Sequence, residues 1–287
     1  PHSTVWYDNV NNIWTESSTL GGGTIYSTLD SISPDYPVSS DVNPWVKSES
    51  YGGYSMFDSE PTYPTITNGL VLWYDAGSST SWPGSGTMWY DITNNSNNGT
   101  FYAGASPSTP TYLTPNLGSF SFNGSNKKVM CGNGTTLSSI TNTVTVEAWV
   151  RPSTLSNYLA IFSKNSNQGF RMRLDSLGRL EMIGGKSGPG VDSYTSVGST
   201  TVNNWVQLVG VWTSTGYYTY INGVSAGYDV TKTLLVQANN LQLEIGVYTG
   251  GGEWFQGDIS VFRVYNRALS ASEVNSNFNS LRSRFGL

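Results

Sequence analysis

The stretch from Trp205 to Gly227, WVQLVGVWTSTGYYTYINGVSAG, constrains the fold of this chain more than any other. Its first half alternates strictly, because Val206, Leu208, Gly210 and Trp212 are interleaved with Gln207, Val209 and Val211. Alternation with a period of two predicts β-strands with two different faces. Thr213–Gly216 predicts one turn, and Asn222-Gly223 favours a type I′ turn, whose two central residues both need positive φ. The stretch therefore predicts three antiparallel strands in a β-meander.

The composition fits a loop-rich β protein. Only 11% of the 287 residues are charged, while 13% are aromatic, and disordered chains usually lack aromatic residues. The length allows one large β-sandwich and a smaller unit.

No apolar run approaches the ~20 residues that span a bilayer, so membrane insertion is not expected. The first ten residues have neither a basic start nor an apolar core, so they are not predicted to be a signal peptide.

Two residue types are almost missing. Cys131 is the single cysteine, so no intrachain disulfide can form, and we expect it to be a small buried apolar residue. His2 is the single histidine and lies at the terminus. Zinc sites and histidine-based catalytic triads are therefore excluded.

The charge is divided unevenly along the chain. Residues 1–65 hold eight acidic side chains and one lysine, a net charge of −7. Residues 66–287 hold eleven acidic and thirteen basic side chains, a net charge of +2. This contrast predicts a boundary near Pro61–Ile66, and the lack of a basic stripe argues against nucleic-acid binding.

The sequence of residues 1–65 predicts little regular secondary structure. Thr4–Asp8 and Asn12–Thr15 can pair as a hairpin, but prolines follow at a density that opposes helices and central strands. We expect an extended arm that lays aromatic rings on a neighbouring surface, and a small independent β unit is the alternative. The aromatic rings that would anchor such an arm are Trp6, Trp14, Trp45, Tyr51 and Tyr54.

Several segments after Gly69 carry a family resemblance. Gly69–Phe101 contains GLVLWYDAG, WPGSGT and WYD, and Ser119–Gly124 is SFSFNG. Thr143–Pro152, TVTVEAWVRP, places Val144, Val146, Ala148 and Val150 on one face, the expected core face. These segments, and the hairpin that ends in Asn-Gly, closely resemble the laminin-G-like, concanavalin A-like jelly rolls carried by bacteriophage structural proteins.

The most specific match is Tyr265–Glu273, YNRALSASE. Ser270 and Glu273 form the pattern of a capping box, which predicts a helix start. Val274, Phe278 and Leu281 would share one helix face, which we expect to close the open end of the sandwich. The resemblance covers residues 68–287. It implies an all-β chain with a two-sheet antiparallel jelly-roll sandwich (66–287), a short C-terminal helix and an irregular N-terminal arm (1–65).

The superfamily includes glycoside hydrolases, which need two carboxylates ~5–9 Å apart. Related β-glucanases carry these on one strand as Glu-x-Asp-x-x-Glu, a spacing that this sequence lacks. Glu147, Glu181 and Glu244 each stand alone on a predicted strand. We therefore expect no catalytic residues and no enzyme activity.

No cofactor is required by these observations, but Ca²⁺ needs separate consideration. Hard cations need six to eight oxygen ligands, usually with several carboxylates. Many relatives carry Asp-Glu where this chain has Ser260-Val261, a departure that weakens such a site. Asp258, Asn123 and Asp91 remain as candidate ligands, and the alternative is that they cap loops and turns.

Glycan binding needs an exposed aromatic ring beside planar polar groups. The glycine-rich segment from Tyr248 to Phe255 offers Trp254 next to Glu253, with Tyr248 at its start. Trp82 and Tyr194 are weaker candidates. The alternative is that these rings cover sheet edges or contact a partner subunit.

The resemblance implies a non-enzymatic structural protein on the surface of a bacteriophage particle, assembled in the host cytoplasm. It would decorate the capsid or form part of a head or tail fibre. The N-terminal arm would bind the major capsid protein or another virion protein, and the jelly roll would face a cell-surface glycan. Homo-oligomerisation stays open. The alternative function is a carbohydrate-binding module from a secreted bacterial enzyme or adhesin.

Overall fold

The computed structural model divides into two compact units, Pro1–Tyr63 and Pro64–Leu287. In the first unit, the structure describes only the backbone of short strands. In the second, it describes residues 64–164, 169–186, 190–235, 241–248 and 250–287. No helix in these described parts is long and apolar enough to cross a membrane.

The described backbone of the first unit forms an antiparallel sheet in the order β3-β2-β1-β5-β4. β1 pairs with β2 with Asp8 opposite Ile13, which confirms the predicted hairpin. Three further short strands, β3, β4 and β5, belong to the same sheet. Trp6, Trp14 and Tyr54 lie on β1, β2 and β5, whereas Trp45 and Tyr51 lie outside the described residues. The strands are β1 (Thr4–Asp8), β2 (Ile13–Ser17), β3 (Tyr26–Thr28), β4 (Val46–Lys47) and β5 (Tyr54–Ser55).

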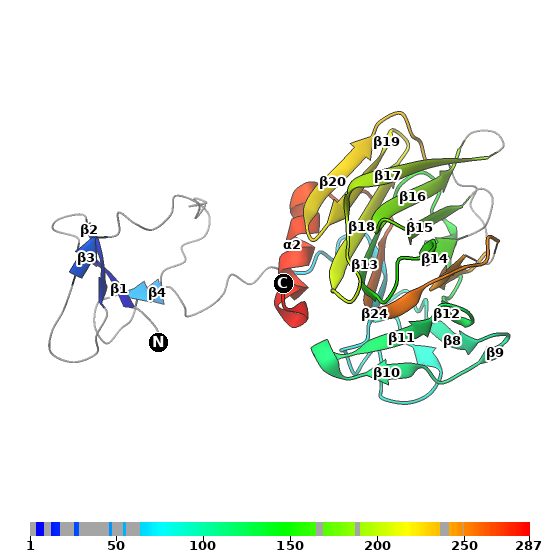
Figure 1. The fold of residues 1–287 in the computed structure, drawn as a ribbon, viewed down its shortest axis with the longest axis horizontal. Coiled ribbons are helices and arrows are strands. Elements are labelled where there is room, and N and C mark those ends of the chain that lie inside the picture. Colours follow the sequence, from blue (N-terminus) through cyan, green and yellow to red (C-terminus); the bar gives the residue numbers. More distant parts are fainter. Residues whose placement is uncertain are drawn as a thin grey trace. The chain divides into compact units, whose positions relative to one another are not determined.

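The second unit is a sandwich of two antiparallel sheets, which confirms the predicted fold class (Figure 1). We name the first the helix-backed sheet. Its order is β10-β11-β24-β13-β18-β19-β20, and β6 also pairs with β24. Its strands are β6 (Leu70–Asp75), β10 (Thr111–Leu113), β11 (Ser119–Asn123), β13 (Val144–Pro152), β18 (Val206–Thr213), β19 (Gly216–Ile221), β20 (Val224–Asp229) and β24 (Gln256–Tyr265).

We name the second the open sheet, with the order β17-β16-β15-β14-β21-β12-β8-β7 and β9 paired with β8. A small hairpin, β22 (Val247–Tyr248) and β23 (Glu253–Trp254), follows β21. The strands of the open sheet are β7 (Met88–Trp89), β8 (Gly99–Ala103), β9 (Ser106–Pro107), β12 (Lys127–Met130), β14 (Leu159–Lys164), β15 (Phe170–Leu174), β16 (Arg179–Gly185), β17 (Val191–Ser199) and β21 (Leu243–Ile245). Short helices are η1 (Pro115–Leu117) and α1 (Thr135–Ser138).

The main core lies between the two sheets and follows the predicted alternation. Val144, Val146, Ala148 and Val150 are fully buried in it, as expected for the core face of β13. Rings from the open sheet meet Trp212 of β18, as in the edge-to-face contact with Phe162 at 6.0 Å between centroids. Cys131 is also buried there, as predicted.

The predicted β-meander is confirmed. β18, β19 and β20 pair in succession, and the turn between β19 and β20 is made by Asn222 and Gly223 with φ of 51° and 75°. Both values lie in the left-handed region that a type I′ turn needs. The second face of β18 is buried as well, because Val209 and Val211 belong to a separate apolar cluster.

That second face is covered by the C-terminal segment, α2 (Ala271–Leu281) and η2 (Arg282–Phe285). Ser270 and Glu273 form the predicted capping box. The expectation that α2 closes the open end of the sandwich was wrong. The helix lies on the outer face of the helix-backed sheet, beside β13, β18 and β20 (Figure 1). The reason is that β13 and β18 carry apolar residues on both faces. Phe285 stacks on Trp149 of β13 at 4.3 Å, and these rings need a cover.

A buried ion pair lies beneath α2. Glu147 of β13 and Arg263 of β24 have fully buried side chains, with Arg263 Nη1 3.4 Å from both carboxylate oxygens. Gln207 Nε2 donates to Glu147 Oε1 at 2.9 Å, and Trp149 Nε1 donates at 3.2 Å. Asn277 of α2 donates to Glu147 Oε2 at 2.8 Å. Glu147 therefore connects three strands of one sheet to the helix that covers them.

Asn277 also fixes the start of the second unit. Its Oδ1 accepts from the Ile66 backbone N–H at 2.9 Å, and its Nδ2 donates to the Tyr265 hydroxyl at 2.9 Å. The Tyr265 hydroxyl donates to the Ile66 carbonyl at 3.0 Å. Burial raises the pKa of Tyr265, which keeps this hydroxyl a donor. The first residues of the sandwich are thus bound to its last helix.

We predict that Glu147→Gln lowers the stability of the sandwich by about 3 kcal/mol, because it leaves the Arg263 charge buried without its partner. Glu273→Gln removes a carboxylate from the partly exposed pair with Arg267 and should cost about 1 kcal/mol. Urea unfolding of the full chain measures both. A Glu147→Gln variant no less stable than Glu273→Gln would contradict this role for the buried pair.

Candidate ligand-binding face

The outer face of the open sheet carries an ordered group of polar and aromatic side chains. On β15, Phe170, Met172 and Leu174 are buried in the core. Arg171 and Arg173 alternate with them, so both point away from the core. We call Arg171, Arg173, Tyr158, Tyr248, Glu181 and Glu253 the arginine face.

Arg173 is held from three sides. Its Nε donates to Glu181 Oε2 on β16 at 2.8 Å, and its Nη1 pairs with Glu253 of β23. Its guanidinium lies 3.6 Å from the centroid of Tyr158, whose side chain is 47% exposed. Burial lowers the pKa of Arg173, but the hydrogen bond and charge of Glu181, followed by the charge of Glu253, outweigh it and raise the pKa. Arg173 is therefore a fixed cation beneath an exposed ring.

Arg171 is held by Tyr248. Its guanidinium lies 3.9 Å from the centroid of the Tyr248 ring, a short cation–π contact. The backbone of Gly250 and Gly251 packs against the same ring, since a Cβ at these positions would come within 2.9 and 2.7 Å of its atoms. Glycine is required there to let the chain approach the ring.

The β22–β23 hairpin supplies two of these groups at once. Tyr248 lies opposite Glu253, and Val247 lies opposite Trp254. Ser163 of β14 donates to the Val247 carbonyl at 2.9 Å, which ties the hairpin to the sheet. Tyr248, Glu253 and Trp254 are thus brought together as the sequence suggested. Tyr248 and Glu253 contact the arginines, while Trp254 is partly exposed on the other face of the hairpin.

The remaining two aromatic candidates lie elsewhere. Trp82 is only 6% exposed and packs in the core, with Phe120 at 5.1 Å edge-to-face, so its prediction as a sugar-stacking ring was wrong. Tyr194 of β17 lies opposite the core residue Met182. It packs against the core, and burial, with a smaller effect of Asp229, raises its pKa. Neither ring joins the arginine face.

Each of the three candidate metal ligands already binds another group of the protein. Asp91 accepts from the backbone of Trp73 and Asn97, both at 3.0 Å. Asp258 Oδ2 binds Arg151 at 2.7 Å, and Asn123 Oδ1 caps its own turn. Within the described residues, no three Asp, Glu, His or Cys side chains are grouped to hold a metal ion.

The three strand glutamates are all paired with cations. Glu147 binds Arg263 inside the protein, Glu181 binds Arg173, and Glu244 binds Lys128 at 2.5 Å. Glu181 and Glu253 come close only because both contact Arg173. The guanidinium occupies the space between these two carboxylates, where a glycosidic bond would have to lie.

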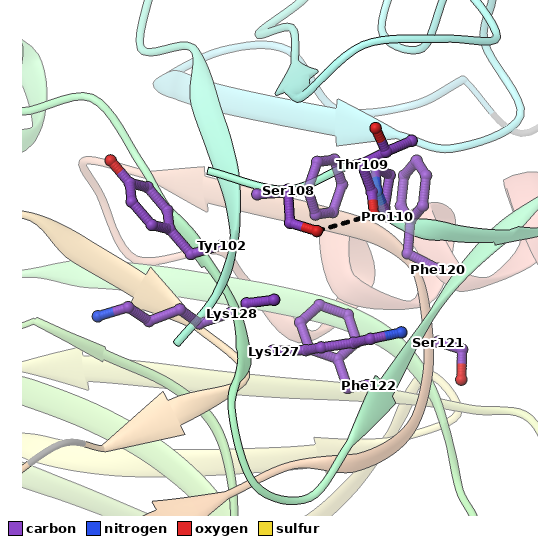
Figure 2. Close-up of a pocket in the computed structure, with 11 residues that line it drawn as sticks. Tyr102, Ser108, Thr109, Pro110, Phe120, Ser121, Phe122, Lys127 and Lys128 are labelled. Atoms are coloured by element: carbon purple, nitrogen blue, oxygen red, sulfur yellow. Dashed lines mark hydrogen bonds between the residues drawn. The ribbon is translucent and has the colours of Figure 1, made fainter. Parts of the chain in front are cut away.

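A pocket lies between β8 and the strands β11 and β12 (Figure 2). Phe120 and Phe122 line it, with Ser108 and Thr109 at its rim. Lys127 Nζ is bound to Thr111 Oγ1 at 2.6 Å. Figure 2 shows Tyr102 and Lys128 pointing away from Lys127. Few polar groups converge here, so this pocket is a weaker candidate than the arginine face.

Arg171, Arg173 and Tyr158 were not predicted as site residues. The alternation in FRMRL (170–174) placed both arginines on one outer face, so that signal was present. The sequence did not show that the β22–β23 hairpin would contact these two arginines.

Comparison with known proteins assigns the fold to a family. Residues 123–275 match the model of the concanavalin A-like lectin/glucanases superfamily. The chain belongs to this family, as the sequence motifs predicted. Among curated proteins, none matched the sequence significantly.

Solved structures share the fold at low sequence identity. The binding domain of Paraclostridial Mosquitocidal Protein 1 is 17% identical with a TM-score of 0.58, and covers 74% of this chain and 52% of its own. The botulinum neurotoxin serotype G binding domain is 16% identical with a TM-score of 0.57, covering 73% and 50%. This chain thus matches about half the length of both. Domain 4 of AbnA, an extracellular arabinanase from Geobacillus stearothermophilus in complex with arabinotriose, is 19% identical with a TM-score of 0.56, covering 72% and 97%.

We predict that Ca²⁺ does not stabilise the sandwich. Asp91 and Asp258 already bind protein donors, so millimolar CaCl₂ or EDTA should shift the melting temperature of the full chain by less than about 1 °C. A rise of several degrees with CaCl₂, reversed by EDTA, would reveal a calcium site.

Proposed function

We propose that this chain is a non-enzymatic glycan-binding protein whose jelly roll binds sugar on the arginine face, and that it is displayed on the surface of a bacteriophage particle. The observation that carries the first part is the exposed Tyr158 ring held over Arg173, beside carboxylates fixed by the same arginine.

The chemistry of this face suits a sugar. A sugar presents an apolar C–H face, which packs on an aromatic ring, and hydroxyl groups at its edge, which need donors and acceptors in fixed positions. Tyr158 offers the ring, and the guanidinium of Arg171 offers N–H donors beside it. Because the arginines stand on a central strand, little side-chain entropy should be lost on binding.

The structural neighbours support a binding role. Two are named as binding domains of toxins, and one is an arabinanase domain in complex with arabinotriose. The pairing of all three strand glutamates with cations supports the absence of catalysis.

The placement on a phage particle rests on sequence. The segments Gly69–Phe101 and Tyr265–Glu273 resemble jelly rolls of bacteriophage structural proteins. Residues 1–63 form a separate, acidic unit, which we propose binds the capsid or another virion protein. The second candidate is a carbohydrate-binding module of a secreted bacterial enzyme, favoured by the match to nearly all of the arabinanase domain.

We predict that Tyr158→Ala weakens glycan binding about fivefold, since a stacking contact contributes about 1 kcal/mol. A glycan array with the full chain identifies the ligand, and calorimetry measures the loss. Tyr228 of β20 is 63% exposed on the other sheet, so Tyr228→Ala is the matched control and should bind normally. If no array glycan binds, or if Tyr158→Ala binds as tightly as the control, the proposed site is wrong.

We predict that deletion of residues 1–63 prevents incorporation into particles, while residues 64–287 still melt cooperatively. The reason is that the sandwich has its own core, and its first residues are bound to α2. Quantitative electrophoresis of purified particles measures occupancy. Normal occupancy of the truncated chain would place the contact on the jelly roll instead.

A further inference from the structure

The two arginines of the arginine face differ in their partners. Arg173 is bound by two carboxylates, whereas Arg171 has none among the described residues. The undescribed residues within 64–287 contain no Asp or Glu, so no acidic side chain of the sandwich is missing from this comparison. Arg171 therefore makes no ion pair with an acidic side chain of its own unit.

The guanidinium of Arg171 is fixed at one end and open at the other. Its Nε is buried without a hydrogen-bond partner among the described residues, although Arg171 as a whole is only partly buried. The ring of Tyr248 lies against it at 3.9 Å, and the glycine backbone holds that ring. The two terminal N–H groups thus form a pre-positioned fork, the geometry that binds a carboxylate with two parallel hydrogen bonds.

We infer that the ligand is an acidic glycan, a uronic acid-type sugar chain whose carboxylate binds Arg171. This inference rests on the proposed function of the arginine face. Arg171 and Arg173 are two residues apart on β15, about 7 Å. A sugar ring on Tyr158, above Arg173, therefore places the carboxylate of a neighbouring sugar unit near Arg171.

The charges around Arg171 favour a ligand that places one carboxylate near this side chain over a densely sulfated sugar chain. Arg173 is neutralised by Glu181 and Glu253, and Lys128 by Glu244. Arg171 therefore offers one positive charge for one negative charge. Densely placed sulfate groups beside Arg173 would find its charge already paired with Glu181 and Glu253, so they would gain no ion pair there.

The test compares acidic polysaccharides with their neutral counterparts on the full chain. Polygalacturonate, alginate and hyaluronate are each assayed beside the same polymer after reduction of its carboxyl groups to alcohols, with neutral arabinan and glucan included. We expect at least one acidic polymer to bind at least tenfold more tightly than its reduced form. Added salt should weaken that binding, because it screens the ion pair.

Three variants assign the effect to one side chain. Arg171→Gln should abolish the preference for the acidic polymer, and Arg171→Lys should restore part of it, because lysine keeps the charge but lacks the fork. Arg282→Gln removes an exposed charge near the C-terminus and should leave the preference intact. Unchanged melting temperatures verify that each variant is folded.

The outcomes separate this inference from the proposed function. If only neutral polymers bind, or if acidic and reduced forms bind equally, the glycan-binding function stands and the acidic ligand is wrong. If the preference survives in Arg171→Gln, the carboxylate is bound elsewhere and the assignment to Arg171 is wrong. If no polymer and no array glycan binds, both the proposed function and this inference fail.

Discussion

The buried pair of Glu147 and Arg263 is the interaction on which the rest of the sandwich depends. A charge with no exposed surface is costly, and the Glu147 carboxylate is tolerated because Gln207, Trp149 and Asn277 also donate hydrogen bonds to it. The partner on α2 can reach Glu147 only when the helix lies flat on the outer face of β13. The ion pair therefore fixes where α2 lies, and Asn277 in turn fixes the entry of the chain at Ile66.

This arrangement makes the two outer faces of the sandwich different. The helix-backed sheet is covered by apolar contacts from α2 and η2, including the stack of Phe285 on Trp149. The open sheet carries charged residues at the equivalent positions of β15 and β16, and the small β22–β23 hairpin contacts the two arginines of β15. The fold thus leaves the open sheet as the face with ordered polar groups and an exposed ring.

Much of this could be predicted from local patterns. The Asn222-Gly223 turn, the alternation on β13 and β18, and the Ser270–Glu273 capping box are each decided by residues close together in sequence, and the structure has all of them. The failures share one cause. Three features depend on segments that are far apart in sequence. They are the burial of Trp82, the position of α2, and the pairing of Glu253 with Arg173, which are 80 positions apart. The apolar residues on both faces of β18 were visible in the sequence, and they require a cover on the second face.

The most direct test of this account is hydrogen–deuterium exchange of the full chain, with and without the polysaccharide that binds it. Exchange reports local opening of the backbone, and a bound ligand slows it where it contacts the protein. The account predicts slower exchange in Phe170–Leu174 of β15 and Glu253–Trp254 of β23, with no change in β18 or α2. Protection confined to the β8–β11–β12 pocket or to residues 1–63 would show that the glycan does not bind the arginine face.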